Sequence, residues 1–282
     1  MENCDLAHYS SARLPSVAKA VVFPDDERKF INLISLLEDE GLTYIVAGGL
    51  SNLLVKGEIY NGVIVKTDKI LTKSLAEKQI TFGCGVRMGG AVMKMASLDL
   101  GGMEGLAGIP GTVGGMVRQN AGAFGYEISD RFIEARCYFP KEAKVRILCK
   151  NDMNFSYRHS FLADKTAILL SATFDFLPKC QSDIISQINT FRTKRYKTQP
   201  LEYPSFGSAF KRYNGTSAGY YIEKCGLKGF SVGGAEVSGK HAGFIVNKGG
   251  ATADDFLKVM EHIKNRVYAV FGIELEEEIE IV

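Results

Sequence analysis

Glycine and small polar residues gather in two tracts that are suited to hold a phosphate group. In the first, residues 46–52, an apolar strand runs into a loop that contains Gly48, Gly49, Ser51 and Asn52. The second, residues 101–125, has nine glycines, more than turns alone require, because each buried glycine gives up side-chain packing and costs chain entropy. Backbone amides freed of side chains can press against a charged or flat ligand. The second tract supplies further candidate cofactor-binding residues: Ile109, Pro110, Gly111, Thr112, Gly114, Gly115, Asn120, Ala121 and Gly122.

Neither tract has the spacing of the two common nucleotide-binding loops. The G-x-x-x-x-G-K-[ST] pattern of ATP-binding loops is missing, and so is the G-x-G-x-x-G of dinucleotide-binding βαβ units. A nucleotide cofactor held by another arrangement of backbone amides is the better explanation of the second tract. The first tract, taken alone, is explained equally well as a turn at the end of a strand.

Hydrophobic spacing predicts an α+β architecture around these tracts. Apolar residues at 3/4 spacing predict helices, and alternating or β-branched runs predict strands. No regular helix is expected through the second tract. Strands and helices in this mixture fit an α+β fold better than a doubly wound sheet. The expected strands are 17–23, 43–47, 62–66, 79–84, 132–139, 145–149, 167–176, 208–211, 244–247 and 274–282, and the expected helices are 27–40, 87–100, 182–197, 218–225 and 253–271.

Length and composition indicate two domains and exclude several classes of partner. A chain of 282 residues, 46% of them hydrophobic, exceeds the size at which one core usually stops growing. We expect a first domain at 1–185, with subdomains of about 1–70 and 71–185, and a second at 186–282. The net charge of +2 is too small to gather nucleic acid or anionic lipid. No apolar run reaches the ~20 residues of a membrane span.

The cysteines and histidines indicate neither disulfides nor a metal. Six cysteines lie far apart without a C-x-x-C pair, and the four histidines do not cluster. The first residues lack the basic start and apolar core of a signal peptide. We therefore expect reduced thiols, no metal site and a cytoplasmic location.

Six segments, in order along almost the whole chain, resemble the UDP-N-acetylenolpyruvoylglucosamine reductases. Their FAD domain is of the vanillyl-alcohol-oxidase type. The similar segments are the loop at 46–52, Gly-Ile-Pro-Gly-Thr-Val-Gly-Gly at 108–115, Asn-Ala-Gly-Ala-Phe-Gly at 120–125, Ser-Tyr-Arg-His-Ser at 156–160, Phe-Gly-Ser-Ala-Phe-Lys at 206–211 and Leu-Glu-Glu-Glu-Ile at 275–279.

The resemblance implies a specific reaction and its cofactors. FAD would be bound non-covalently by the first domain, NADPH would donate hydride, and the second domain would bind the substrate. UDP-N-acetylglucosamine-enolpyruvate would be reduced to UDP-N-acetylmuramate, a step of peptidoglycan precursor synthesis. The short chain is similar to the compact type II subclass, and we expect a monomer.

The same resemblance implies that Arg158, Ser208 and Glu278 are the catalytic residues. A guanidinium can pair bidentately with the enolpyruvyl carboxylate and stabilise charge that grows there. The serine hydroxyl would give a proton to C2, and the glutamate would hydrogen-bond near C2 and help to relay that proton. Each of the three also has an ordinary explanation when taken alone. The arginine could be a surface residue, the serine a turn residue, and the glutamate a residue on the solvent-exposed face of an edge strand. Their order behind the glycine tracts favours the catalytic interpretation.

Four further residues are candidates for substrate binding, namely Tyr157, Lys211, Arg212 and His241. The lysine is suited to a diphosphate as a point cation. The histidine is explained slightly better as a packed residue at a strand end.

Several positions depart from the family pattern. Leu50 stands where a third glycine is usual, and residues 12–15 lack a glycine pair. Arg118, Arg212 and Glu277 also replace the residues expected there. These changes bear on the affinity for FAD and on substrate choice more than on the fold.

Two other functions fit the same tracts. An FAD oxidase would share the cofactor domain but would need another substrate cap and no serine acid. A diverged FAD- or nucleotide-binding paralogue would keep the site without the activity.

Overall fold

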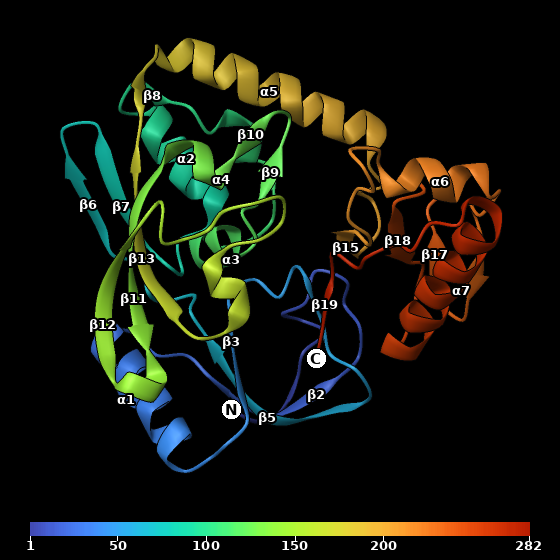
Figure 1. The fold of residues 1–282 in the computed structure, drawn as a ribbon, viewed down its shortest axis with the longest axis horizontal. Helices are drawn as coiled ribbons and strands as arrows, with labels where there is room; N and C mark the ends of the chain where they lie inside the picture. The colour runs from blue at the N-terminus through green and yellow to red at the C-terminus, as the bar shows by residue number, and fades with distance from the viewer. The chain divides into compact units, whose positions relative to one another are not determined.

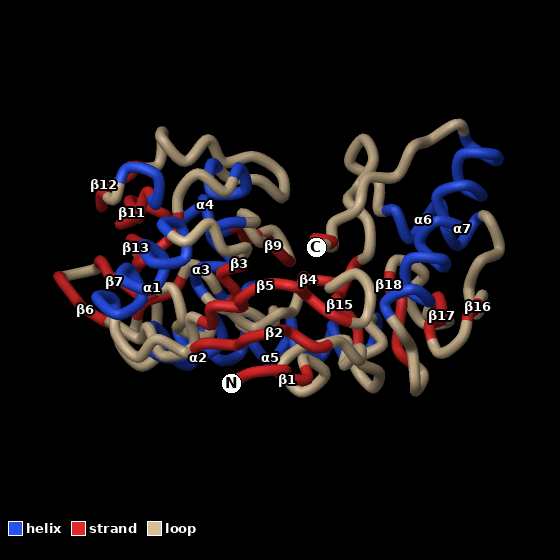
Figure 2. The backbone as a smooth tube through the Cα atoms, turned by 90° about the horizontal axis from the view of Figure 1, so that it is seen from below, coloured by secondary structure: helices blue, strands red, loops and turns tan.

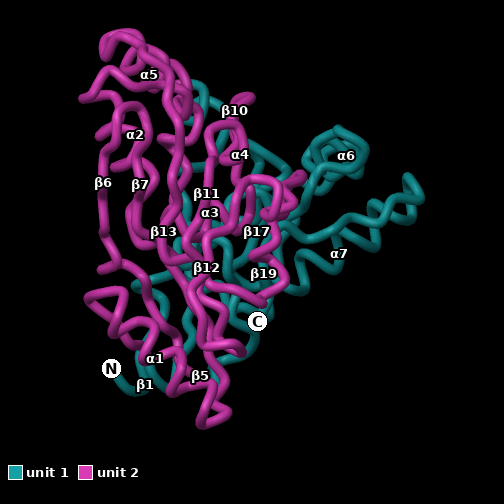
Figure 3. The backbone as a smooth tube through the Cα atoms, turned by 60° about the vertical axis from the view of Figure 1, so that its left-hand side comes forward, with its two compact units in different colours: residues 1–20, 50–61, 194–282 teal, residues 21–49, 62–193 magenta.

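The computed structural model describes residues 1–282, which form two compact units that are both discontinuous in sequence. Unit 1 comprises residues 1–20, 50–61 and 194–282, and unit 2 comprises residues 21–49 and 62–193 (Figure 3). The chain passes from one unit to the other within strands β2 (Val17–Val22) and β5 (Ile59–Lys66), within helix α5 (Gln181–Thr198), and after Gly49.

This division differs from the two contiguous domains expected at 1–185 and 186–282. Residues 50–61 group with the C-terminal residues because β4 (Leu53–Leu54) pairs in parallel with β19 (Glu280–Ile281). Composition cannot reveal such a pairing, since its two strands are short and lie far apart in the chain.

Unit 2 is built on a five-stranded antiparallel sheet in the order β12-β11-β13-β7-β6 (Figure 1). Helix α3 packs on β13 and β7, and buried residues on both sides of this contact form one core. The strands are β6 (Lys73–Ala76), β7 (Gln79–Gly83), β11 (Phe132–Phe139), β12 (Lys144–Cys149) and β13 (Ile168–Asp175), and the shorter helices are α2 (Met88–Ala96), α3 (Val113–Arg118) and α4 (Ile128–Arg131).

Helix α1 (Glu27–Asp39) shows why the sequence forms helix there. The Asp26 side chain caps its first turn by accepting from the Lys29 amide at 2.7 Å. Phe30, Ile34 and Leu37 recur on one buried face. The next strand, β3 (Tyr44–Ala47), pairs in parallel with residues 63–66 of β5, so its end delivers the first glycine tract beside the end of β5.

Unit 1 contains a four-stranded antiparallel sheet in the order β15-β18-β17-β16, with α7 packed on β16 and β17 (Figure 2). A capping box of Thr252 and Asp255 begins α7, and Gly272, in a left-handed conformation, ends it. The elements are β15 (Ser205–Ser208), β16 (Ser231–Val232), β17 (Ala235–Val237), β18 (Phe244–Asn247), α6 (Ala218–Lys224) and α7 (Ala253–Phe271), and β1 (Glu2–Asp5) pairs with the start of β2.

The predicted elements agree with the structure where patterning is long and regular. The strands at 132–139 and 244–247 and the helix at 253–271 match residue for residue, whereas α1 differs by one residue at its end and α5 by one residue at each end. The helix predicted at 87–100 ends at Ala96, because β8 (Leu100–Gly101) pairs with β14 (Leu177–Pro178).

Three predictions at the candidate site were wrong in detail. The second glycine tract does contain a short helix, α3, whose first amides donate to the carbonyls of Val86 and Cys84. The strand predicted at 208–211 ends at Ser208, and the one predicted at 274–282 is reduced to β19. No helix has the length and apolar character needed to cross a membrane.

Candidate active site

The two predicted glycine tracts meet in unit 2. A Cβ added to Gly48 would lie 2.2 Å from Thr112 Oγ1, and one added to Gly49 would lie 3.7 Å from Gly111 Cα. The backbone of Gly111 accepts from Met88, and Thr112 bridges Arg87. The close approach at position 48 leaves no room for a side chain. It therefore explains the need for glycine there.

The hydroxyl at this meeting point fits a phosphate ligand. Thr112 is 1% exposed, and its Oγ1 has no hydrogen-bond partner in the protein. Buried polar atoms are nearly always paired, so an unpaired one marks the place of an absent partner. Phosphate oxygens are strong acceptors, and the diphosphate of FAD would satisfy the hydroxyl.

Asn120 is placed differently from the direct cofactor contact predicted for it. Its side chain is 1% exposed and is fully engaged within the protein. The Nδ2 donates to Glu127 Oε2 at 3.1 Å and to the Ser156 carbonyl at 3.0 Å, and Oδ1 accepts from the Ser129 amide at 3.0 Å. The amide thus ties the end of the glycine tract to the segment that carries Arg158.

Arg158 lies at the tip of a two-residue turn between Ser156 and His159, which exchange both backbone hydrogen bonds. Its φ of 55° is in the left-handed region, an uncommon conformation for an arginine that stores strain. Nη2 donates to the Gly122 carbonyl at 3.0 Å, and the guanidinium lies over the Tyr157 ring at 5.0 Å. Unit 2 therefore brings the predicted arginine onto the predicted glycine tract.

Ser208 follows a bulge in strand β15 of unit 1. The register between β15 and β18 shifts between Ser205 and Ser208, and Gly207 has a φ of 83°. Bulges of this kind turn a side chain out of the regular alternation and are frequent beside active sites. The next amide, of Ala209, donates to the Gly243 carbonyl, and the chain then leaves β18.

The terminal segment brings the backbone of Glu278 to the residue that follows Ser208. The Glu278 amide donates to the Ala209 carbonyl at 2.9 Å, and Phe210 forms a bridge with Glu277. Further along, the Glu280 amide donates to the Asn52 carbonyl at 2.9 Å. The segment pairs first with residues 209 and 210 and then with Asn52. Because its hydrogen-bonding partner changes along its length, most of it is not a regular strand.

Asn52, predicted to bind the cofactor, also holds this segment. Its Nδ2 donates to the Glu278 carbonyl at 2.8 Å. Ser51, in the same loop, accepts at its carbonyl from Ser11 Oγ at 3.4 Å, and that hydroxyl also donates to Ser205 at 2.7 Å. The second half of the first tract, residues 50–52, thus belongs to unit 1, whereas Gly48 and Gly49 belong to unit 2.

The departure at Leu50 has a structural correlate. The residue has a φ of 47°, which glycine would adopt without strain, yet it is 5% exposed. The residue lines a small internal cavity of unit 1 together with Leu6, Leu14 and Phe206. Burial of the leucine side chain offsets the conformational cost.

His241 is both packed and close to the serine. Its ring meets that of Phe244 edge-on at 4.9 Å, and Nδ1 accepts from the Gly243 amide at 3.1 Å. A Cβ on Gly243 would be 3.2 Å from Nδ1 and 3.4 Å from Ser208 Oγ. Burial lowers the pKa of His241, which favours the neutral ring with its hydrogen on Nε2.

The two cationic substrate candidates differ in their surroundings. Lys211 is engaged in an ion pair with Glu276, so it would have to exchange this partner to reach a diphosphate. Arg212 is exposed in the turn that follows, which is closed by a bridge between Tyr213 and Thr216.

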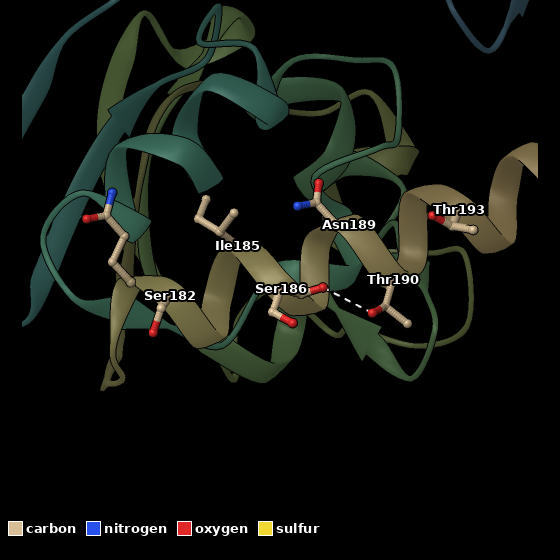
Figure 4. A pocket seen from close by; sticks show the side chains of 7 residues that line it. Ser182, Ile185, Ser186, Asn189, Thr190 and Thr193 are labelled. Atoms are coloured by element: carbon tan, nitrogen blue, oxygen red, sulfur yellow. Dashed lines mark hydrogen bonds between the residues drawn. The ribbon is translucent and has the colours of Figure 1, made fainter.

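The open hollow on unit 2 does not mark the site. Residues of a single helix, α5, line it, and Thr190 there donates to the Ser186 carbonyl at 3.0 Å (Figure 4). None of the predicted site residues is among them.

Three charged residues beside the first tract were not predicted. Lys66 donates to the Gly48 carbonyl and pairs with Asp68 at 3.0 Å, and Arg87 pairs with Asp68 at 2.8 Å. The lysine side chain is only 3% exposed. A lysine at the end of an otherwise apolar strand, two residues before an aspartate, was the available signal.

Comparisons with known proteins match two stretches of the chain to two different domain families. Residues 18–147 match an FAD-binding domain, and residues 199–282 match the C-terminal domain of UDP-N-acetylenolpyruvoylglucosamine reductase. With the glycine cradle and the unpaired Thr112 hydroxyl, they define an FAD-dependent oxidoreductase, as predicted.

Full-length relatives narrow the class to one family. The UDP-N-acetylenolpyruvoylglucosamine reductase of Caldicellulosiruptor saccharolyticus is 40% identical over 98% of this chain and 90% of its own length, and that of Fervidobacterium nodosum is 38% identical over 99% and 90%. The crystal structure of the Thermus caldophilus enzyme superposes with a TM-score of 0.83 at 28% identity, covering 99% of this chain and 97% of the other. The chain belongs to the UDP-N-acetylenolpyruvoylglucosamine reductases, a family of peptidoglycan precursor synthesis.

Proposed function

We propose that the chain reduces UDP-N-acetylglucosamine-enolpyruvate to UDP-N-acetylmuramate with NADPH as the electron source. The observation that carries this proposal is the 2.9 Å hydrogen bond from the Glu278 amide to the Ala209 carbonyl. It sets the backbone of Glu278 beside the residue that follows Ser208, within the part of the chain that matches the reductase C-terminal domain. A hydroxyl and a carboxylate on adjacent segments suit delivery of a proton to carbon.

When bound, FAD supplies the transfer of hydride from NADPH to the methylene carbon of the enolpyruvyl group. The protein has two further tasks in this addition. Negative charge that develops at C2 and on the neighbouring carboxylate must be stabilised, and C2 must receive a proton to complete the saturated lactyl ether.

Arg158 is assigned the first task. Its planar guanidinium can pair bidentately with the carboxylate and strengthen that contact as charge grows. The strained turn and the hydrogen bond to Gly122 hold the side chain before substrate arrives. Such preorganisation lowers the cost of reaching the charged state.

Ser208 and Glu278 are assigned the second task. The serine hydroxyl gives its proton to C2, and the carboxylate accepts a hydrogen bond near C2 and helps to restore the hydroxyl proton. His241, neutral and with Nδ1 occupied, offers its Nε2 hydrogen to a substrate acceptor. Lys211 and Arg212 serve the substrate diphosphate, and Tyr157 supports the substrate beside Arg158.

One assay separates this function from the alternatives. The purified, yellow protein is mixed with NADPH under anaerobic conditions, with and without the enolpyruvyl sugar. We expect sustained NADPH oxidation only when the sugar is present, with one NADPH consumed for each lactyl product. In a separate assay under air, oxygen consumption with a sugar alcohol and no NADPH would instead identify an oxidase. Flavin binding without either activity would identify a binding paralogue, and either result overturns the proposal.

A further inference from the structure

The first glycine tract rests on a group of three charged side chains, Lys66, Asp68 and Arg87. The lysine reaches the Gly48 carbonyl from the end of β5, and the aspartate joins it to the arginine through contacts of 3.0 and 2.8 Å. The arginine reaches the next residue of the loop, since a Cβ on Gly49 would lie 2.8 Å from Nη1. Both glycines of the loop are thus touched by one connected group.

Backbone contacts fix the positions of these side chains. The Thr67 amide, between the lysine and the aspartate, donates to the Ala47 carbonyl at 3.0 Å, directly before the loop. A Cβ on Gly85 would lie 1.8 Å from the Thr67 carbonyl. Only glycine permits this approach, and it brings the segment leading to Arg87 within reach of Asp68.

Burial makes the pairing of Lys66 necessary. A buried ammonium is costly without partners. Burial lowers the pKa of Lys66, whereas the Asp68 carboxylate opposes that shift and Arg87 adds to it. The aspartate is therefore the partner that opposes the effect of burial on the ammonium group beside the loop.

We propose that Lys66, Asp68 and Arg87 act as a positioning group that holds the Gly48–Gly49 backbone in the shape that receives the FAD diphosphate. These three residues would determine the affinity for the cofactor, whereas the residues assigned above act in the reaction. This inference rests on FAD binding, and its test does not require turnover.

Asp68→Asn distinguishes positioning from simple attraction. This change removes a negative charge beside the loop, so attraction of the diphosphate alone predicts tighter FAD binding. Loss of the positioning group predicts the opposite, and we expect binding to weaken about tenfold, as for one weakened charge-assisted hydrogen bond. Titration of FAD-free protein by quenching of flavin fluorescence measures the affinity.

Two companion variants extend the test. Arg87→Gln should weaken FAD binding severalfold, and the loss should persist near 1 M salt, where the Debye length of about 3 Å screens the field of an exposed charge. Lys66→Met should weaken binding at least as much as Asp68→Asn. If the buried lysine variant fails to fold, the other two, whose side chains are partly exposed, still decide.

The loop itself gives a readout without any ligand. In FAD-free Asp68→Asn protein, amide hydrogen exchange in residues 46–52 should be faster than in the parent protein, while exchange in β11 stays unchanged. Lys69→Met, which removes a charge from an exposed neighbour, is the matched control and should alter neither exchange nor affinity. Unchanged loop exchange, or FAD affinity equal to or above the parent value in Asp68→Asn, overturns the inference.

Discussion

The side-chain amide of Asn52 holds the backbone of Glu278 through a 2.8 Å hydrogen bond, although 226 positions separate the two residues. The backbone that carries the carboxylate proposed to act in catalysis is thereby anchored from a loop that the sequence connected only with the cofactor. Loop and terminus belong to the same unit.

Replacement of Asn52 by alanine should separate these two roles. We expect the reoxidation of reduced flavin by the enolpyruvyl sugar to slow about tenfold, because one partly buried hydrogen bond that holds the Glu278 backbone is lost. FAD affinity should change little, and Asn61→Ala, at an exposed position, should leave both quantities unaltered. A loss of FAD affinity without a slower reoxidation would return Asn52 to the cofactor-binding role that the sequence predicted.

Gly48→Ala should abolish tight FAD binding. The added Cβ would lie 2.2 Å from Thr112 Oγ1, and overpacking of this kind costs about 1–3 kcal/mol. The double variant with Thr112→Ala removes the clashing hydroxyl and should recover part of the thermal stability. Recovery of stability without recovery of full FAD affinity is expected, because the hydroxyl is itself proposed to bind phosphate. A normal FAD affinity in the single variant Thr112→Ala would contradict the proposed contact between this hydroxyl and phosphate.

Arg158→Lys should reduce turnover by about a hundredfold or more, because a point charge cannot reproduce a bidentate contact with a carboxylate. The side chain also loses the hydrogen bond to Gly122 that preorganises it. Steady-state kinetics with the sugar substrate give the measurement. Arg136→Lys, which changes an exposed arginine on β11 that pairs with Glu27, is the control, and normal kinetics in Arg158→Lys would reject the role.

Ser208→Ala should let NADPH bleach the flavin at the normal rate while the sugar reoxidises it very slowly. The proton donor to C2 would be missing, and the loss should be on the order of 10²–10⁴-fold, the usual range for a general acid. Stopped-flow absorbance separates the two half-reactions. Ser231→Ala, at an exposed position in unit 1, should behave as the parent protein, and unimpaired reoxidation in Ser208→Ala would remove the serine from proton transfer.

His241 should make the folded protein sensitive to acid. Because burial lowers its pKa below the ordinary value near 6.5, the unfolded chain binds its proton more readily than the folded one. Stability contributed by the neutral ring is therefore full above pH about 6.5 and falls as the pH drops toward the folded-state pKa. Denaturant unfolding measured between pH 7 and 5 should show that the free energy of unfolding falls less for His241→Gln than for the parent protein. The exposed His8, changed to Gln, should leave the profile as it was.

Long, periodic elements and dense glycine could be recognised from sequence because each carries its signal locally. Helix α7 was predicted to the residue, and its capping box, its buried apolar face and Gly272 are all local features of the sequence. Both glycine tracts were recognised as candidate cofactor-binding segments, although the contact of Gly48 with Thr112 was not predicted.

Features that depend on distant partners could not be predicted. The bulge at Gly207 and the exchange of partners by residues 276–282 arise from pairings with β18, with Ala209 and with Asn52, which leave no local pattern. Lys66 was overlooked for the same reason, since a single buried lysine is recognisable only once its carbonyl and carboxylate partners are in place.

The repeated crossing of the chain between its units has a consequence for biosynthesis. Residues 50–61 are synthesised long before β19, the strand that pairs with β4. Unit 1 therefore stays incomplete until nearly all of the described chain has been made. A fragment that starts at residue 194 would lack β4 and the Ser11 contacts, and should aggregate or be degraded when expressed by itself. Nascent protein would accordingly spend most of its synthesis as a half-assembled molecule, the stage at which chaperones protect exposed apolar surface.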